Sequence, residues 1–369
     1  TVVIMLMAVA PVGLMLFLLA TAPAVAKLAT LDRVSAVSLM MFIGAVGSIL
    51  GVDTIGVLRR EAFEARKLGQ YRLKRLLGSG GMGVVYLAEH ELLKRPCVIK
   101  LIQPSKAGDP LVLARFQREV QFTAKLSHWN TIEIFDYGVT ADGTFYYVME
   151  YLPGMSLAEM VERYGPLPPE RVIYLLRQTC DALHEAHSAG LIHRDIKPGN
   201  IFVAQRGGVY DVAKLLDFGM VKPLDEGQSV QLTNLGMVAG SPLFMSPEQA
   251  MGEANPDARS DIYSLGAVAY YALTGRPPFE GDRIMMVLMA HVRDEVVPPS
   301  RHNSRIPADL EQVVLKCLAK APIERYQDVV GLAEALGRCE AANRWSRQHA
   351  AQWWQAASVQ QTGSSNYDD

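Results

Sequence analysis

The chain has 369 residues, and 50% of them are hydrophobic, so it can bury a sizeable core in one large domain or two ordinary ones. The formal net charge is −2 and no block of like charge occurs, so nucleic acid is not an expected partner. The four cysteines lie far apart and form no CxxC pair, which argues against a zinc site and a disulfide framework.

Two apolar runs open the chain. Residues 1–26 contain no charge, and residues 35–57 contain only Asp53. Each run is long enough to cross a bilayer, which takes about 20 residues, so both are predicted to be transmembrane helices rather than buried core helices. The first run also fits a signal peptide, since residues 24–26 read AVA, but no basic segment precedes it. Because the chain opens with Thr1, we expect upstream sequence to be missing, and whether it holds further spans stays open.

Basic residues set the expected orientation in the membrane. Residues 59–67 hold four Lys or Arg side chains, whereas the connector at residues 27–34 holds two. The positive-inside rule therefore places the following domain in the cytoplasm, as part of a multi-pass protein of the cell membrane. Residues 58–70 are charged and free of Pro, so they predict a helical juxtamembrane linker that ends at Gly69.

A domain that begins near Tyr71 is predicted to start with a small antiparallel sheet. Runs rich in β-branched and aromatic residues mark strands at residues 71–77, 84–92, 96–102, 131–138 and 144–152. A helix at about residues 110–127 interrupts them. These elements predict a first lobe made of a sheet and one helix.

Helical patterns dominate the rest of the chain. Residues 167–190 have Pro near the start, apolar residues at helical spacing and Gly at the end, which is typical of a buried helix. Further helices are expected at about residues 258–275, 282–292, 308–319 and 328–337, which gives a larger helical lobe within a domain that ends at residue 337.

Residues 338–369 are expected to form a C-terminal tail that begins as a helix and ends in disorder, because its last residues are Gly, Ser, Asn and Asp. The tail contains Trp345, Trp353 and Trp354. These side chains either anchor the tail on the helical lobe or bind a partner, since tryptophan is frequent in interfaces.

A glycine cluster, GSGGMGVV, lies between the first two predicted strands. Gly78, Gly80 and Gly83 have the spacing GxGxxG, which lets a backbone approach phosphate without obstruction by side chains. In a dinucleotide-binding fold a helix would follow, whereas here a β-rich run follows. The spacing alone is a weak signal, and in this context it predicts a hairpin over a ligand.

Two residues of opposite charge are candidates for a functional pair. Lys100 ends CVIK on a predicted strand and can point inward to phosphate, although an isolated strand lysine is usually just solvated. Glu119 lies on the amphipathic helix FQREVQFTAKLSH, from which its carboxylate could face Lys100 and hold it.

The stretch LIHRDIKPGN, residues 191–200, gathers acidic, basic and amide side chains between two apolar runs. Asp195 can accept a proton from an attacking hydroxyl, and Lys197 can neutralise charge that develops on a phosphoryl group. The amide oxygen of Asn200 and the carboxylate of Asp217, in LLDFG, can share a divalent cation. Mg²⁺ is the expected ion, because it suits oxygen ligands combined with substrate phosphates.

Together these motifs resemble those of protein kinases, specifically the bacterial serine/threonine kinases of eukaryotic (Hanks) type, which are often membrane-anchored. The resemblance covers about residues 71–337. It rests on GSGGMGVV, CVIK, Glu119, HRDIKPGN, DFG, SPE and SDIYSLG in that order, a combination that chance rarely produces. It implies an α+β fold, the bilobal protein-kinase fold, which two transmembrane helices would precede here.

The resemblance implies a role for each candidate residue, with ATP and Mg²⁺ as cofactors and Mn²⁺ as an alternative metal. Asp195 would be the catalytic base, and Lys197 would contact the γ-phosphate. Asn200 and Asp217 would hold the metal ion.

The implied nucleotide site draws on both lobes. Lys100 would contact the α- and β-phosphates, and Glu119 would pair with Lys100 in the active state. The implied nucleotide-binding residues are Gly78, Ser79, Gly80, Gly81, Met82, Gly83, Val85, Lys100, Glu150 and Leu152.

The resemblance also implies regulation through an activation loop at residues 217–248. Arg194 would pair with a phosphate added to this loop, for which Thr233 is the first candidate and Ser229 the second. Ser241, in GSP, stands where the family usually has Thr, and it keeps a hydroxyl that can bond to the catalytic loop.

Two further departures from the family pattern occur. HWN at residues 128–130 replaces the common HPN, and SPE replaces APE, with Glu248 still available to pair with Arg325. Neither departure touches an implied phosphate or metal contact.

These residues predict an enzyme that transfers the γ-phosphoryl group of ATP to Ser or Thr hydroxyls of proteins, autophosphorylates its activation loop and signals from the membrane. Serine/threonine specificity follows, by resemblance, from DIKPGN. One alternative is a pseudokinase, which the presence of Asp195, Lys100 and Asp217 opposes. Another is a membrane anchor or receptor with the kinase as its output. The spans would hold the chain in the lipid bilayer and can pair two copies, so a homodimer that phosphorylates in trans is a further hypothesis.

Overall fold

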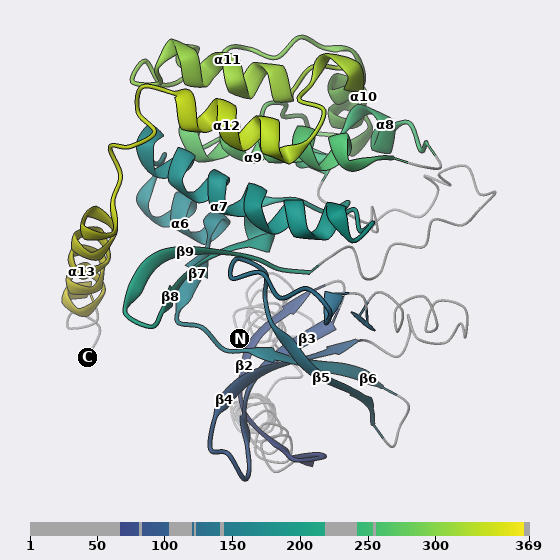
Figure 1. Ribbon diagram of the computed structural model, residues 1–369, viewed down its shortest axis with the longest axis vertical. Helices are drawn as coiled ribbons and strands as arrows, with labels where there is room; N and C mark the ends of the chain where they lie inside the picture. Colours follow the sequence, from purple (N-terminus) through teal and green to yellow (C-terminus); the bar gives the residue numbers. More distant parts are fainter. Residues whose placement is uncertain are drawn as a thin grey trace, which may run out of the picture. The chain divides into compact units, whose positions relative to one another are not determined.

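The structure is a computed structural model, whose elements are labelled in Figure 1. It describes residues 67–80, 83–102, 120–121, 123–140, 144–217, 242–253 and 256–364. The predicted transmembrane helices, residues 1–26 and 35–57, lie outside these residues, as does most of the predicted juxtamembrane linker. Within the described residues, no helix combines the length and the apolar character that a membrane span requires.

The chain divides into two compact units, Thr1–Arg75 with Ala88–Arg95 and Leu76–Leu87 with Pro96–Asp369. All the described candidate catalytic residues belong to the second unit.

The described part of the first unit begins with β1 (Lys67–Leu68), which pairs antiparallel with the start of β2 (Tyr71–Gly80). The turn between them places Gly69 at a φ of 58°, a conformation that glycine adopts at little cost. The helix predicted over residues 58–70 is therefore wrong at its C-terminal end. Pairing with β2 satisfies the backbone groups of these residues in place of helical hydrogen bonds.

The first lobe is built on a six-stranded sheet with the order β1-β2-β3-β4-β6-β5. The strands that follow β2 are β3 (Gly83–His90), β4 (Pro96–Ile102), β5 (Ile134–Val139) and β6 (Phe145–Glu150). β6 pairs antiparallel with both β4 and β5. The predicted antiparallel first lobe and its five strands are confirmed.

One face of this sheet carries an apolar cluster. Val120 packs there with Ile102, Ile134, Phe145 and Tyr147, all of which are buried. Residues 120, 121 and 123 are helical, in agreement with the predicted helix at about 110–127, and the chain turns at residues 124–125. Glu119 lies outside the described residues.

A second, three-stranded sheet was not predicted from the sequence. Its order is β7 (Gly154–Ser156), β8 (Ile201–Arg206) and β9 (Val209–Leu215). Ser156 then caps α6 (Leu157–Tyr164), because its hydroxyl accepts a hydrogen bond from the backbone of Glu159 while the Glu159 carboxylate accepts from the backbone of Ser156. β8 begins directly after Asn200, and β9 ends two residues before Asp217, so the hairpin of β8 and β9 connects these two candidate metal ligands.

The second lobe is helical, as predicted. Its helices are α7 (Pro169–Ser188), α8 (Pro247–Ala250), α9 (Ala258–Thr274), α10 (Ile284–Arg293), α11 (Ala308–Cys317) and α12 (Val329–Arg338). Short 3-10 turns lie at Pro198–Asn200, Pro242–Phe244, Pro299–Arg301 and Pro322–Glu324. α7 contacts α9 and α12, and α9 also contacts α11, so α9 lies at the centre of this lobe (Figure 1). Asp257 caps its N-terminus and Gly275, at a φ of 77°, ends it.

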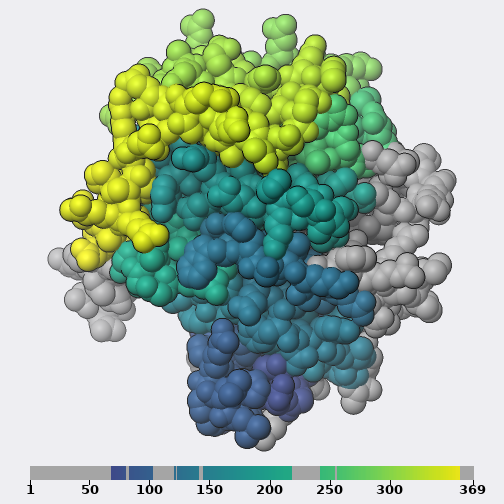
Figure 2. Space-filling model, viewed as in Figure 1, coloured from purple at the N-terminus to yellow at the C-terminus, as the bar shows by residue number. Residues whose placement is uncertain are grey.

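A helix beyond the kinase-like region, α13 (Arg347–Ser364), packs against β9. Figure 2 shows this C-terminal segment, in yellow, lying directly against the teal surface of the lobe. The guanidinium carbon of Arg171 lies 3.8 Å from the ring centre of Trp353. Trp354 donates a hydrogen bond to Asp211. The tryptophans therefore anchor the tail on the helical lobe, the first of the two predicted alternatives.

Candidate active site

The segment from 191 to 200 is held in place by a buried aspartate of α9. Asp261 accepts hydrogen bonds from the backbone N–H groups of His193 and Arg194, each at 2.8 Å, and its Oδ2 also contacts His187 Nε2 at 2.8 Å. Burial alone would raise the pKa of Asp261, but the hydrogen bond and charge of His187 bring that pKa below its ordinary value. Asp261 therefore remains a carboxylate that can accept both backbone bonds.

Asp195, Lys197 and Asn200 converge at the next turn of this segment. The Asp195 side chain is buried, and its Oδ2 lies 2.9 Å from Lys197 Nζ and 3.2 Å from Asn200 Nδ2. Asn200 Nδ2 also donates to the backbone oxygen of Asp195 at 2.7 Å, within the 3-10 turn that starts at Pro198. The three predicted residues are therefore brought together, with the carboxylate oriented by two donors.

His193 connects this segment to Asp217. Its Nε2 lies 2.8 Å from the backbone oxygen of Leu216, which can only accept, so Nε2 carries the proton. Its Nδ1 accepts from the backbone N–H of Asp195 at 3.3 Å. Burial lowers the pKa of His193, which favours this neutral form. The position of Asp217 is thus coupled to that of Asp195.

Asp217 receives two donors from the sheet of the first lobe. Lys100 Nζ lies 2.6 Å from Oδ2, and the Tyr147 hydroxyl donates to Oδ1 at 2.7 Å. Burial raises the pKa of Asp217, but the charge and hydrogen bond of Lys100, followed by the bond from Tyr147, lower it below its ordinary value. Burial and the adjacent carboxylate raise the pKa of Tyr147 well above 10, so its hydroxyl stays protonated. The ion pair of Lys100 is with Asp217, while the predicted partner Glu119 lies outside the described residues.

Glu150, one of the implied nucleotide-binding residues, is anchored by residues of the second sheet. The buried Glu150 carboxylate accepts from Lys214 Nζ at 2.7 Å and lies 3.4 Å from Arg206. Burial lowers the pKa of Lys214, and the hydrogen bond from Lys214 to Glu150 opposes this. The Glu150 side chain is thus engaged by β8 and β9, and its backbone N–H donates to the backbone oxygen of Glu133 at 3.0 Å.

The glycine-rich motif has at least one structural requirement. A Cβ at Gly83 would lie 2.0 Å from the backbone oxygen of Leu101, and its φ of 152° also requires glycine, so β3 can approach β4 only with glycine there. Gly78 has open space around it, Ser79 is exposed and Val85 is half-buried. Gly80 is the last residue of β2, while Gly81 and Met82 lie outside the described residues.

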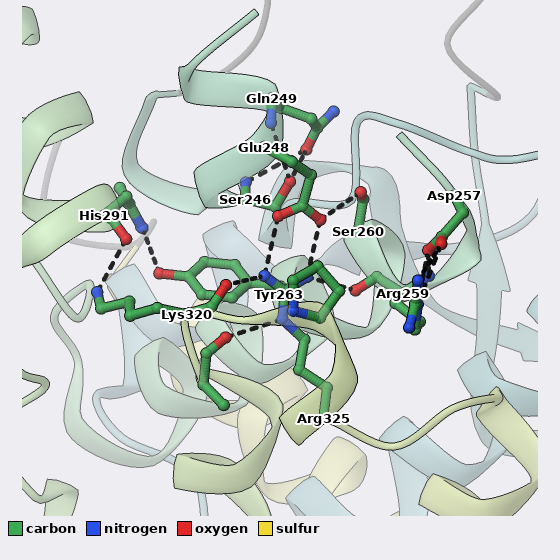
Figure 3. Close-up of polar contacts among 12 residues, drawn as sticks. Ser246, Glu248, Gln249, Asp257, Arg259, Ser260, Tyr263, His291, Lys320 and Arg325 are labelled. Carbon is green, nitrogen blue, oxygen red and sulfur yellow. Dashed lines mark hydrogen bonds and ion pairs between the residues drawn. The ribbon is translucent and has the colours of Figure 1, made fainter. Parts of the chain in front are cut away.

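The C-terminal end of the predicted activation loop is locked by the expected ion pair (Figure 3). Arg325 donates to both oxygens of Glu248, at 2.7 and 2.9 Å, and Ser260 also donates to this carboxylate. All three side chains are buried. Gln249 donates to the backbone oxygen of Arg194 at 2.9 Å and so joins this anchor to the catalytic segment.

The predicted regulatory residues Ser229, Thr233 and Ser241 lie outside the described residues.

The chemistry of these groups fits a nucleotide-bound divalent cation. Asn200 uses its amide nitrogen for both hydrogen bonds to Asp195. The amide oxygen is therefore left as the atom that can bind a cation. Asp217 adds a carboxylate kept ionised by Lys100 and Tyr147. Mg²⁺ binds with few protein oxygens when phosphates and water complete its shell.

Sequence reasoning did not find Tyr147, His193, Asp261 or Lys214 as site residues. Each acts through a partner distant in sequence, such as Asp261 with His193 over 68 positions. His193 and Asp261 lie in the motifs HRDIKPGN and SDIYSLG, but these motifs do not indicate that the two residues pair, and Tyr147 and Lys214 lie in none of the quoted motifs.

A comparison with protein families decides the classification. Residues 71–336 match the protein kinase domain. The chain belongs to the protein kinase family. The match covers both lobes described above and ends before α13, so the docked tail is an addition to the family domain.

Two bacterial proteins are among the similar curated relatives. The chain is 44% identical over 262 residues to serine/threonine-protein kinase PknB of Mycolicibacterium smegmatis. The aligned region covers 70% of this chain and 41% of that protein. It is 39% identical over 259 residues to serine/threonine-protein kinase pkn3 of Myxococcus xanthus, covering 69% of this chain and 47% of that protein. The chain thus spans less than half the length of these relatives. The resemblance to bacterial serine/threonine kinases of the eukaryotic type is confirmed.

Solved structures agree with the fold. The PknI kinase domain of Mycobacterium tuberculosis is similar with a TM-score of 0.58 and 27% sequence identity, covering 74% of this chain and 97% of that domain. The predicted bilobal protein-kinase fold is therefore confirmed.

Proposed function

We propose that this chain is an ATP-dependent serine/threonine protein kinase. The observation that carries the proposal is the pairing of Asp195 with Lys197 and Asn200 on a segment that His193 joins to the Lys100–Asp217 ion pair. Every residue type that phosphoryl transfer needs is present in a suitable local setting.

Each side chain has a role in this proposal. Mg²⁺·ATP, when bound, supplies the γ-phosphoryl group that is transferred. Asp195 orients the substrate hydroxyl and accepts its proton, and the adjacent Lys197 neutralises charge on the transferred group. Asn200 and Asp217 hold the metal ion, while Lys100 moves between Asp217 and the phosphates.

The proposed acceptors are Ser and Thr hydroxyls of proteins. Lys197 lies two residues after the proposed base, and its ammonium contacts that base at 2.9 Å. The similar proteins described above are serine/threonine kinases by name. Autophosphorylation on Thr233, with Ser229 as a second site, would place a phosphate for Arg194 to bind.

We further propose that the chain is a multi-pass protein of the cell membrane with its kinase domain in the cytoplasm. The apolar runs at residues 1–26 and 35–57, and the basic residues that follow the second run, support this proposal. Two copies brought together by these spans would phosphorylate one another in trans. A protein that is monomeric at all detergent concentrations and autophosphorylates at a rate independent of its concentration would exclude that step.

The experiment is transfer of labelled γ-phosphate from ATP and Mg²⁺ by the full chain in detergent to a generic basic protein. Asp195→Asn is the matched control, since it keeps the side-chain shape and removes the base. We expect phosphoserine and phosphothreonine in wild type and a rate lower by a factor of about 10² to 10⁴ in the variant. Nucleotide binding without any transfer would instead favour a pseudokinase, or a kinase that stays inactive until its membrane segments bring two copies together.

A further inference from the structure

Two side chains on neighbouring strands reach the same carboxylate. Lys100 in β4 and Tyr147 in β6 are Cα partners in the antiparallel ladder, so their side chains lie next to each other on one face of the sheet. Lys100 Nζ lies 5.8 Å from the centre of the Tyr147 ring. The ladder therefore presents an ammonium and a phenol hydroxyl side by side.

Each donor contacts a different oxygen of the Asp217 carboxylate. Lys100 donates to Oδ2 at 2.6 Å, and Tyr147 donates to Oδ1 at 2.7 Å. Tyr147 is only 1% exposed and packs in the apolar cluster of the sheet, so its ring has little freedom to move. The position of its hydroxyl oxygen is consequently fixed by the packing of the ring rather than by Asp217.

We propose that Tyr147 is a positioning residue that orients the Asp217 carboxylate for the metal ion of the nucleotide. The inference rests on the proposed function and deepens it. Lys100 would share its donors between Asp217 and the phosphates, whereas Tyr147 can keep its whole bond, because each carboxylate oxygen has two lone pairs. Tyr147 is then the donor that holds the carboxylate when the nucleotide is bound.

The size of the effect follows from the behaviour of metal sites. Groups that hydrogen-bond to a metal ligand orient it, and their loss typically weakens metal affinity by about 10- to 100-fold. An ordinary buried tyrosine that only satisfies its hydroxyl would affect stability and nucleotide binding without regard to the metal. Metal dependence therefore separates the two roles.

The test compares Tyr147→Phe with wild type and with Tyr146→Phe, using the full chain in detergent. Successive strand residues point to opposite faces, so Tyr146→Phe removes the same hydroxyl from the other face of β6. ADP binding is measured by calorimetry without metal and across a Mg²⁺ titration. Thermal melting without ligand confirms that each variant is folded, and Tyr147→Leu, which also lacks a donor, replaces Tyr147→Phe if that variant does not fold.

We expect Tyr147→Phe to bind metal-free ADP within about twofold of wild type and to need roughly tenfold more Mg²⁺ for tight ADP binding. Tyr146→Phe should match wild type in both. A Mg²⁺ requirement equal to that of wild type, or equal losses with and without metal, would overturn the role of Tyr147. If wild type itself bound ADP with no response to Mg²⁺, the proposed function would fail instead.

Discussion

Arg171 of α7 and Asp211 of β9 form an ion pair in which both side chains are fully buried. Two guanidinium nitrogens donate to the two carboxylate oxygens at 2.7 and 2.9 Å. Trp345 and Trp354 complete the site, since their indole N–H groups donate to the same oxygens at 2.9 and 2.7 Å. The tail beyond the family domain thus satisfies a charge that lies inside that domain.

Arg171→Met should lower the free energy of unfolding by about 3–5 kcal/mol, because it leaves the Asp211 charge buried without its cation. Urea unfolding followed by tryptophan fluorescence measures the change. Arg163→Met is the control, since Arg163 lies 3.9 Å from Glu159 at the surface and such a pair contributes less than about 1 kcal/mol. Equal losses in the two variants would contradict the importance of burial here.

Trp345→Phe and Trp354→Phe should each lower the free energy of unfolding by about 1.5–3 kcal/mol, since each removes one hydrogen bond to a buried carboxylate. Trp353→Phe is the matched control. Trp353 contacts Arg171 and Tyr164 through its ring, and Phe retains most of that contact. Urea unfolding of the three variants would contradict this view of the tail if Trp353→Phe proved the most damaging.

The lobes and the catalytic residues could be predicted from the sequence because their signals are local. Helical periodicity marked α7 and α9 to α12, and the residue types of LIHRDIKPGN indicated chemistry without any knowledge of the fold. The sheet of β7 to β9 was missed because β7 has three residues and β8 contains Gln205 and Arg206, which weaken the alternation.

The supporting contacts could not be predicted, because they join residues far apart. Lys214 has the appearance of a solvated strand lysine, yet it is buried against Glu150, which precedes it by 64 positions. The tail sequence contains three tryptophans, but it does not indicate that they bind to the Arg171–Asp211 pair. Only the fold brings such partners together.

Glu248→Gln should make the stability of the protein fall less steeply as the pH is lowered. The paired Glu248 has a pKa below its ordinary 4.5, despite the burial that raises it, because Arg325 and Ser260 donate to the carboxylate. Its contribution is therefore present above pH 4.5 and disappears as the pH falls through the lower folded-state pKa. The variant should be less stable than wild type at pH 7, and the difference should shrink below pH 4.5. Thermal melting across pH 3 to 7 measures both values, and a constant difference would count against this linkage.

Asp261→Asn should impair catalysis more than nucleotide binding. The carboxylate accepts backbone N–H groups on both oxygens, from His193 on Oδ2 and from Arg194 on Oδ1. An amide has one oxygen, so whichever way Asn is turned, one of these N–H groups faces a donor and loses its bond. The cost is about 1–3 kcal/mol in the free energy of unfolding, with a displaced catalytic segment.

Asp257→Asn is the control for this change, because Asp257 caps the same helix and Asn caps equally well. We expect Asp261→Asn to lower kcat by at least about tenfold, as misplaced catalytic groups commonly do, while ADP affinity stays near that of wild type. Asp257→Asn should leave both values unchanged. Unaltered kcat in a destabilised Asp261→Asn protein would mean that Asp261 supports the fold alone and does not position Asp195.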